Sequence, residues 1–150
     1  MRLLAFFAVS TWLAGVSCHH RTVAPVVPVG ELTFRVECPA GTPGAVSESA
    51  SGMTISFGAP QIFPLAYAGP GEHVGGRAAI AFEIVEDQKA RFTAMTESCL
   101  HYALAIYIDG AFISAPTVQG SLPGKGLIAG GMSGWTAEER DAWLARIKNS

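Results

Sequence analysis

Apolar and polar residues alternate along several short stretches of the chain, which is the period-two pattern of strands that bury one face. The alternation is clear over residues 32–37, 53–57 and 77–85, and a shorter apolar run covers 127–129. Gly58 and Pro60 follow the second stretch and are expected to end it. The pattern therefore predicts at least four separate strands.

The stretch from Leu104 to Val118 predicts a β-hairpin. Two apolar, β-branched runs flank Asp109-Gly110, and this dipeptide supplies the positive φ angles that a two-residue type I′ turn demands. Pro116 is expected to end the second run, because proline cannot donate to a sheet ladder. The strand residues, the turn residues and the closing proline in this stretch all favour the hairpin.

Two segments have the period of a helix. Within residues 86–102, apolar side chains recur at spacings of three, four and three residues and form one stripe, made of Phe92, Met95, Cys99 and Tyr102. The second helix is expected to start at Thr136, because Thr136-Ala137-Glu138-Glu139 has the form of a capping box. This helix is expected to bury Trp143 and Ile147.

The remaining segments are expected to be loops and turns. Residues 39–52 are rich in Gly, Ser, Ala and Pro, while 61–68 are apolar without a clear period. Turn chemistry is found at 69–71, 75–76 and 124–126. The whole pattern predicts an α+β fold, a single, mostly antiparallel sheet with two helices packed on one face.

The N-terminal segment has the form of a secretory signal. Arg2 precedes an uncharged apolar run that is shorter than the about 20 residues of a membrane span. The run ends in Ala14-Gly15-Val16-Ser17-Cys18, which resembles the bacterial lipobox. The resemblance implies cleavage before Cys18 and lipidation of its sulfur, and ordinary cleavage nearby is the alternative. Residues 1–17 are thus expected to be a signal peptide, and the protein a periplasm-facing lipoprotein of the bacterial envelope or, alternatively, a secreted or soluble periplasmic protein.

Residues 18–30 follow as a tether rich in Pro and Val, and 31–150 as one domain. The pair His19-His20 lacks the convergent ligands of a metal site. Cys38 and Cys99 leave two alternatives, since they can form a disulfide outside the cytoplasm, or Cys99 can be a small buried hydrophobe on its helix.

Composition narrows the function. The net charge is −2 and the basic residues are scattered, which argues against nucleic acid as a partner. With 49% hydrophobic and 15% charged residues, the chain can bury one real core. Ser114, His101 and Cys99 stand in no motif that pairs a nucleophile with a base. We therefore expect no enzyme, no cofactor, no metal and no small-molecule substrate.

Four short sequence motifs, in their order and spacing, resemble those of one known family. They are Phe92-Thr93-Ala94-Met95-Thr96, Leu104-Ala105-Ile106-Tyr107-Ile108-Asp109-Gly110, Ile113-Ser114-Ala115-Pro116 and Thr136-Ala137-Glu138-Glu139. The resemblance covers residues 78–147 and is to the head subdomain of the first periplasmic (P1) domain of SecD and SecDF, the export membrane protein that assists Sec-dependent translocation. The family has no catalytic residues in this region, so none are transferred.

The resemblance implies a non-enzymatic domain that binds unfolded polypeptide or docks on Sec-type translocon components, on a membrane through its lipid anchor. The chain has no stretch for the membrane helices through which the family uses the proton gradient, so a motor function is not implied. The alternative is a structural envelope lipoprotein, a scaffold unrelated to protein export.

Candidate contact residues lie in the hairpin and in the apolar segment 62–67, because exposed apolar groups among turns suit unfolded segments. They are Ile62, Phe63, Leu65, Tyr67, Asp109, Gly110 and Phe112. The alternative for Phe63 and Leu65 is that they complete the core.

Overall fold

A computed structural model describes residues 26–50, 52–73, 75–130 and 134–150 of the chain. The described part contains eight strands and two helices. In chain order the elements are β1 (Glu31–Val36), β2 (Val46–Ala50), β3 (Met53–Phe57), β4 (Gln61–His73), β5 (Arg77–Ile84), α1 (Glu86–Ser98), β6 (Leu104–Ile108), β7 (Ala111–Ser114), β8 (Lys125–Ala129) and α2 (Ala137–Lys148).

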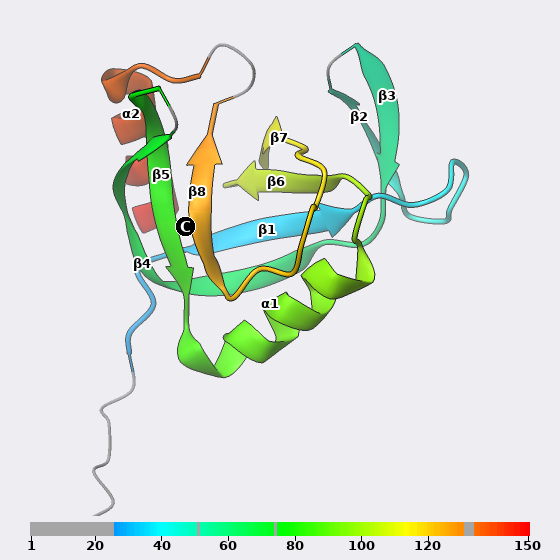
Figure 1. Ribbon diagram of the computed structural model, residues 1–150, viewed down its shortest axis with the longest axis horizontal. Helices are drawn as coiled ribbons and strands as arrows, with labels where there is room; N and C mark the ends of the chain where they lie inside the picture. The colour runs from blue at the N-terminus through cyan, green and yellow to red at the C-terminus, as the bar shows by residue number, and fades with distance from the viewer. Residues whose placement is uncertain (1–25, 51, 74, 131–133) are drawn as a thin grey trace, which may run out of the picture.

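Six strands form one sheet in the order β7-β6-β1-β4-β5-β8, and every neighbouring pair is antiparallel. The long strand β4 joins the two halves, since it pairs with β1 over 61–64 and with β5 from Leu65 onward. A bulge between Leu65 and Tyr67 interrupts this second ladder. Bulges bend a strand and increase its twist, and Figure 1 shows β4 curving between the two halves of the sheet.

The main core lies on one side of the sheet and takes side chains from both helices. Phe92 of α1 is wholly buried, and its ring lies 5.1 Å from Phe34, 5.2 Å from Phe63 and 6.3 Å from Phe82. Leu144 and Ile147 of α2 belong to the same cluster. Edge-to-face aromatic packing of this kind adds about 0.5–1.5 kcal/mol per pair beyond burial. The expected sheet with two helices on one face is confirmed.

The two-stranded hairpin of β2 and β3 packs on the opposite side of the sheet. Phe57, at the end of β3, is wholly buried against Ala103, Ala105 and Tyr107. Figure 1 shows the rest of the hairpin standing away from the body of the molecule.

The hairpin of β6 and β7 and the start of α2 have the geometry that the sequence predicts. Asp109 and Gly110 have φ angles of 48° and 73°, both positive as a type I′ turn requires. At α2, the Glu139 amide donates to Thr136 Oγ1 at 3.2 Å, and the Thr136 amide donates to Glu139 Oε2 at 2.8 Å. The capping box is therefore complete.

Three segments that were expected to be loops or turns are strands. Residues 46–50, within the expected loop 39–52, form β2, because Val46 pairs with Phe57 and each following residue pairs with β3. The expected turn at 69–71 lies inside β4. Proline is tolerated there because β1 has already ended its pairing, which leaves one edge of β4 open. Two residues of the expected turn 124–126, Lys125 and Gly126, belong to β8.

The first helix is shorter than expected and its apolar stripe is incomplete. Helix α1 ends at Ser98, so Tyr102 lies beyond it and is exposed. The chain reverses at His101, whose φ is 69° and whose amide donates to the carbonyl of Val118. In α2, Ile147 is wholly buried as expected, whereas Trp143 is half-buried and Leu144 fills the core.

The two ends of the domain meet at one corner. The amide of Val29 donates to the carbonyl of Leu65 at 2.9 Å, and the amide of Leu65 donates to the carbonyl of Gly30 at 2.8 Å. The amide of Glu31 donates to the Ser150 hydroxyl at 3.3 Å. The last residues of the expected tether thus dock on β4. The signal peptide, Cys18 and the histidine pair lie outside the described residues.

Cys38 and Cys99 are both free thiols, so the bridge between them, one of the two alternatives, is not formed. Cys99 is wholly buried in the main core, as the other alternative predicts. Burial raises the pKa of its thiol. Neither described helix has the length and apolar character needed to cross a lipid bilayer.

Candidate functional site: the helix-free face of the sheet

Neither of the two described helices packs on one side of the strands β4, β1, β6 and β7, and we call this side the helix-free face. Side chains alternate between the two sides of a strand, so the neighbours of the buried Leu32, Phe34 and Ile106 point to this face. The ladders align Ile62 with Thr33, Thr33 with Tyr107, and Tyr107 with Phe112. A single row therefore crosses four strands, from Ile62 at one end to Phe112 at the other.

The row is apolar at both ends, and these ends reach solvent, while Tyr107 within the row is buried. Ile62 is 47% exposed, and Phe112 is half-buried with its ring centre 5.6 Å from that of Tyr107. Thr33 lies between them with a polar hydroxyl. Such a surface can exclude water from an apolar partner side chain and still offer a hydrogen bond.

The hairpin of β2 and β3 forms a wall beside this row. Glu48 of β2 accepts a hydrogen bond from the Tyr107 hydroxyl at 3.1 Å, which fixes the wall to the sheet. Burial and the neighbouring Glu48 carboxylate raise the pKa of Tyr107 to about 12. Arg35 lies 5.7 Å from the centre of the Tyr107 ring and donates to the carbonyl of Gly58 at 2.8 Å.

At the other end of the row, Arg91 of α1 reaches the open edge of β4. Its guanidinium lies 4.1 Å from the centre of the Phe63 ring and donates to the carbonyl of Ile62. With Pro60, Gln61 and Ile62 it lines a shallow hollow. Arg91 therefore covers a backbone acceptor that β1 and β5 both leave unpaired.

The structure separates the residues of the segment 62–67, which is a strand and not a loop. Phe63 and Leu65 have no exposed surface and lie in the main core. The expectation that they offer a contact surface is corrected, because strand alternation points them inward and the alternative role in the core is the observed one. Ile62 and Tyr67 point outward.

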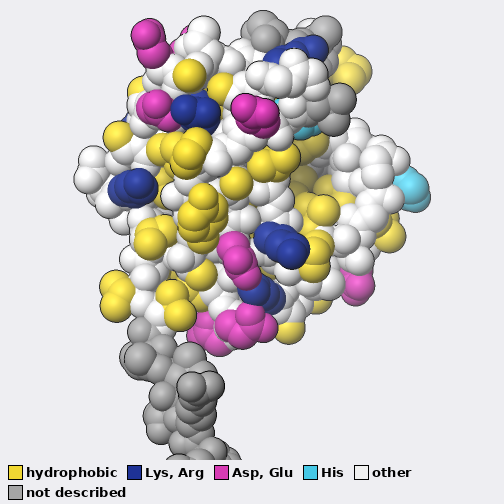
Figure 2. Space-filling model, turned by 60° about the vertical axis from the view of Figure 1, so that its left-hand side comes forward, with side chains coloured by type: hydrophobic (Ala, Val, Ile, Leu, Met, Phe, Trp, Pro, Cys, Tyr) yellow, Lys and Arg dark blue, Asp and Glu magenta, His cyan; other side chains and the backbone are white. Residues whose placement is uncertain are grey.

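Tyr67 lies beyond the β4 bulge, on a second exposed apolar area. Its hydroxyl covers Gly69, where an added Cβ would lie 2.2 Å from that oxygen. In the adjoining ladders Tyr67 pairs with Glu83, and Leu127 pairs with Ala81. Figure 2, in which the left-hand side of Figure 1 comes forward, shows hydrophobic side chains over the middle of the face, with charged side chains around them.

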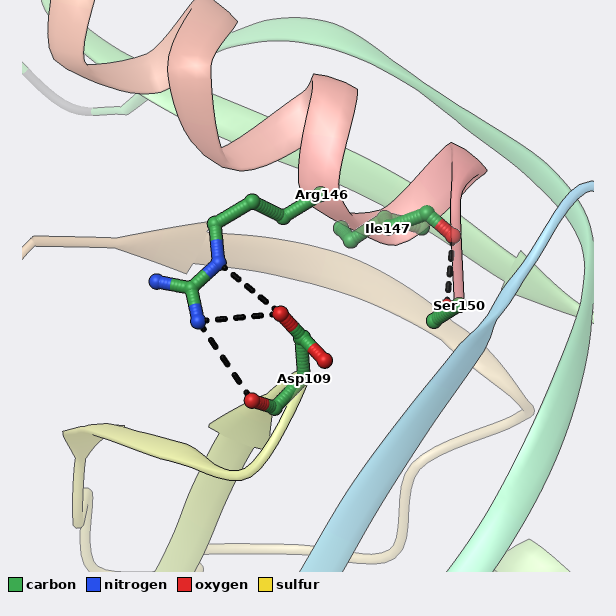
Figure 3. A network of polar contacts seen from close by, with 4 residues as sticks. All are labelled: Asp109, Arg146, Ile147 and Ser150. Atoms are coloured by element: carbon green, nitrogen blue, oxygen red, sulfur yellow. Dashed lines mark hydrogen bonds and ion pairs between the residues drawn. The ribbon is translucent and has the colours of Figure 1, made fainter.

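Asp109 and Gly110 form the exposed turn between β6 and β7, away from the centre of the row. The turn is fastened to α2, since Asp109 Oδ2 accepts hydrogen bonds from Nε and Nη2 of Arg146 at 3.2 and 3.0 Å. Figure 3 shows this link beside the end of α2, where the Ser150 hydroxyl donates to the Ile147 carbonyl. Asp109 therefore serves the fold, and of the three hairpin residues predicted as contacts, Asp109, Gly110 and Phe112, only Phe112 reaches the helix-free face.

Charged groups near the second area pair with one another. Lys89 Nζ lies 2.5 Å from Glu83 Oε1 and 2.7 Å from Glu86 Oε2. The hydrogen bond from Lys89 lowers the pKa of Glu83, and the same contact raises the pKa of Lys89. Among the described residues, no three His, Cys, Asp or Glu side chains converge as a metal site.

Sequence reasoning missed Thr33, Tyr107 and Arg91 as parts of this surface. Thr33 and Tyr107 stand in strands with the right period, but which residues share a row depends on the register between β1 and β6. Arg91 carries no signal of its own, because its role comes from the placement of α1 against the edge of β4.

Comparison with known proteins identifies the family of this chain. The family model described as "SecDF, P1 head subdomain" matches residues 64–145, more than half of the chain. The chain belongs to this family. No match was found among curated proteins.

Two solved structures share the fold. A crystal structure of SecDF in the super-membrane-facing form superposes with a TM-score of 0.57 at 20% identity, covering 79% of this chain. A structure of SecDF, a membrane component that enhances protein export, superposes with a TM-score of 0.58 at 17% identity, covering 81%. The chain spans 19% and 62% of these two chains. It is thus a domain of a protein-export-related family.

Proposed function

We propose that this protein is a non-enzymatic, membrane-tethered module that contacts polypeptide, or docks on a protein-export partner, through the helix-free face. One observation carries the proposal. Ile62 and Phe112 are exposed or half-buried at two ends of one row, on a side of the sheet that neither helix covers. Exposed apolar groups rimmed by polar ones mark interaction surfaces.

The chemistry of the face suits a polypeptide better than a small molecule. Ligand pockets are concave and bury most of the ligand, whereas the hollow beside Ile62 is shallow and lined by only four residues, Pro60, Gln61, Ile62 and Arg91. A broad row with a wall at one side supports contact with an extended chain or with the surface of another protein.

The anchor is part of the proposal. Cleavage before Cys18 and acylation of its sulfur would hold the domain at the periplasmic side of an envelope membrane, since buried methylenes contribute about 0.8 kcal/mol each. Labelling of cells with a radioactive fatty acid should mark the wild-type chain and not a Cys18→Ala variant. Equal labelling of the two chains would remove the anchor from the proposal.

The contact surface can be tested in cells with a photo-crosslinking amino acid. We expect adducts with protein-export components or with polypeptides in transit when the crosslinker replaces Ile62 or Phe112. Glu97, exposed on the outer side of α1, is the matched control and should give few adducts.

The outcome separates two functions. Adducts that are specific to Ile62 and Phe112 and contain export components support the proposal. An equal and sparse pattern at all three positions would favour the alternative, a structural envelope scaffold with no polypeptide partner.

A further inference from the structure

Strand β8 forms one edge of the six-stranded sheet, because it pairs with β5 and with no other strand. The ladder fixes which backbone groups are paired. The amide of Ile84 donates to the carbonyl of Gly124 at 2.8 Å, and hydrogen-bonded and non-hydrogen-bonded pairs alternate along an antiparallel ladder. Gly126 and Ile128 therefore direct their amides and carbonyls toward β5.

The intervening residues direct theirs away from the sheet. They are Lys125, Leu127 and Ala129, and within the described part of the chain their outward amides and carbonyls have no hydrogen-bond partner. Leu127, at the centre, is 48% exposed. An edge of this kind is a template for another strand.

Other edges of the described sheet are shorter, covered or interrupted by proline. Strand β7 has four residues, and Pro116 follows two residues after it. In β4, Arg91 donates to the carbonyl of Ile62 on the side that β5 leaves open, and Pro70, which has no amide to donate, lies in the stretch that β1 leaves open. Strand β8 contains no proline, and no side chain of the described residues is bonded to its outward groups.

We propose that the outward edge of β8 takes up an extended polypeptide segment as an additional antiparallel strand. The inference rests on the proposed function and names the means by which the domain would hold a polypeptide of varied sequence. Backbone amides and carbonyls are the same in every chain, so strand addition gives affinity without a sequence requirement, and only neighbouring side chains add a preference.

Those neighbouring side chains define the class of segment. Leu127 lies at the middle of the edge, next to Ala81 and on the same side of the sheet as Tyr67. Lys125 lies at its beginning. The edge thus fits an extended segment with an apolar residue opposite Leu127 and without a cluster of positive charge.

The size of the edge favours a transient polypeptide over a second copy of this chain. Strand β8 has five residues, or about 17 Å at about 3.4 Å per residue. Specific, stable interfaces bury about 1,200–2,000 Å², which a single short strand pair does not approach. A short strand contact gives the weak, reversible binding that suits a client in transit.

The test uses the purified full chain, with reduced and carboxymethylated α-lactalbumin as a permanently unfolded probe. Amide hydrogen exchange, followed by NMR, reads the edge directly. In the free protein the amides of Lys125, Leu127 and Ala129 should exchange fast, while those of Gly126 and Ile128 are protected by β5. Saturation with the probe should slow the three outward amides by about tenfold or more.

Two substitutions at Leu127 distinguish the contribution of its backbone amide to probe binding from that of its side chain. Leu127→Pro removes an outward amide but no bond to β5, and proline is tolerated at an edge position of this kind. We expect it to weaken probe binding by about fivefold or more, because one hydrogen bond is lost and the ring obstructs the added strand. Leu127→Ala keeps the amide and should stay within about threefold of wild type. Thermal unfolding of both variants checks that the sheet is intact.

The outcomes distinguish this inference from the proposed function. Probe binding that leaves the three amides and the Leu127→Pro variant unaffected overturns strand addition and leaves polypeptide contact standing. No binding of the probe overturns strand addition and counts against polypeptide contact. If the three amides exchange slowly without probe, and if their protection increases with protein concentration, the edge pairs with a second copy of the chain and the inference is overturned. If Leu127→Pro unfolds the domain, exchange in the wild-type chain still decides.

Discussion

Arg146 of α2 holds Asp109 of the β6–β7 turn through three hydrogen bonds: Nε at 3.2 Å and Nη2 at 3.0 Å donate to Asp109 Oδ2, and Nη2 donates to the Asp109 carbonyl at 3.4 Å. The same guanidinium lies 4.5 Å from the centre of the Trp143 ring. Asp109 has a φ of 48°, a backbone conformation that residues other than glycine rarely adopt. The same residue joins the hairpin to the last helix. Aspartate is among the few residues that tolerate this conformation.

Substitutions at the turn should separate the ion pair from the backbone. Both partners are partly exposed, so Asp109→Asn, which keeps the tolerance of positive φ, should cost about 0.2–1 kcal/mol of unfolding free energy. Gly110→Ala should cost about 1 kcal/mol, because an added Cβ meets nothing and only the φ of 73° is strained. Denaturant unfolding measures both. A loss above about 2 kcal/mol for Asp109→Asn would contradict a solvent-screened pair.

Gly30 should tolerate no side chain. Its φ is 148°, and an added Cβ would lie 1.9 Å from the carbonyl oxygen of Ile147. Gly30→Ala should therefore displace either the chain before β1 or the end of α2, at a cost of about 3 kcal/mol or more. Gly41→Ala is the matched control, with a φ of 84° and open space around it, and should cost about 1 kcal/mol. Similar midpoints of thermal unfolding for the two variants would refute the close approach.

Thr96 should resist replacement by an isosteric apolar residue. It is wholly buried, and its hydroxyl donates to the Thr93 carbonyl at 2.9 Å and accepts from the Leu122 amide at 3.0 Å. Thr96→Val leaves that amide without its acceptor and should cost about 1–3 kcal/mol. Thr96→Ser keeps the hydroxyl and loses one methyl group, so it should cost about 1 kcal/mol. If valine proves no worse than serine in denaturant unfolding, the bridge from α1 to the loop before β8 contributes nothing.

Stability should fall above pH 10 because of Tyr107. Its pKa rises from 10.0 to about 12 on folding, so between these values the unfolded chain loses the proton and the folded chain keeps it. The unfolded state then binds fewer protons, and unfolding becomes more favourable as pH rises, by up to about 2–3 kcal/mol.

Thermal unfolding of wild type and Tyr107→Phe from pH 9 to 12 checks this dependence. The difference between the two proteins removes the contribution of the lysines, which titrate in the same range. Wild type should lose stability relative to the variant as pH rises. Ultraviolet absorbance of the folded wild type should show one tyrosine that ionises at a higher pH than the others. Parallel pH profiles would contradict a buried, neutral Tyr107.

Local signals in the sequence determine most of the fold that was predicted. The Asp109-Gly110 turn and the Thr136 capping box are each specified by a few adjacent residues, and both are confirmed. Strand β2 was missed because Ser47 and Ser49 have low strand propensity, and pairing with β3 overrides it. Residues 69–71 resemble a turn by composition, yet β5 pairs with them along their length.

The candidate site was only half predictable. Exposed Ile62 and half-buried Phe112 were both named from their apolar character, but nothing local places them in one row, because four strands must first align. Phe63 and Leu65 share the composition of Ile62 and point the other way. A one-residue change of register would exchange these roles.

Because Glu31 and Ser150 touch at one corner, we expect residues 31–150 to tolerate insertion into a surface loop of a host protein. Domains whose ends lie close together are the ones that tolerate such insertion. The same fold can therefore form part of a much larger chain. In the SecDF structure, the matched part is 19% of the chain.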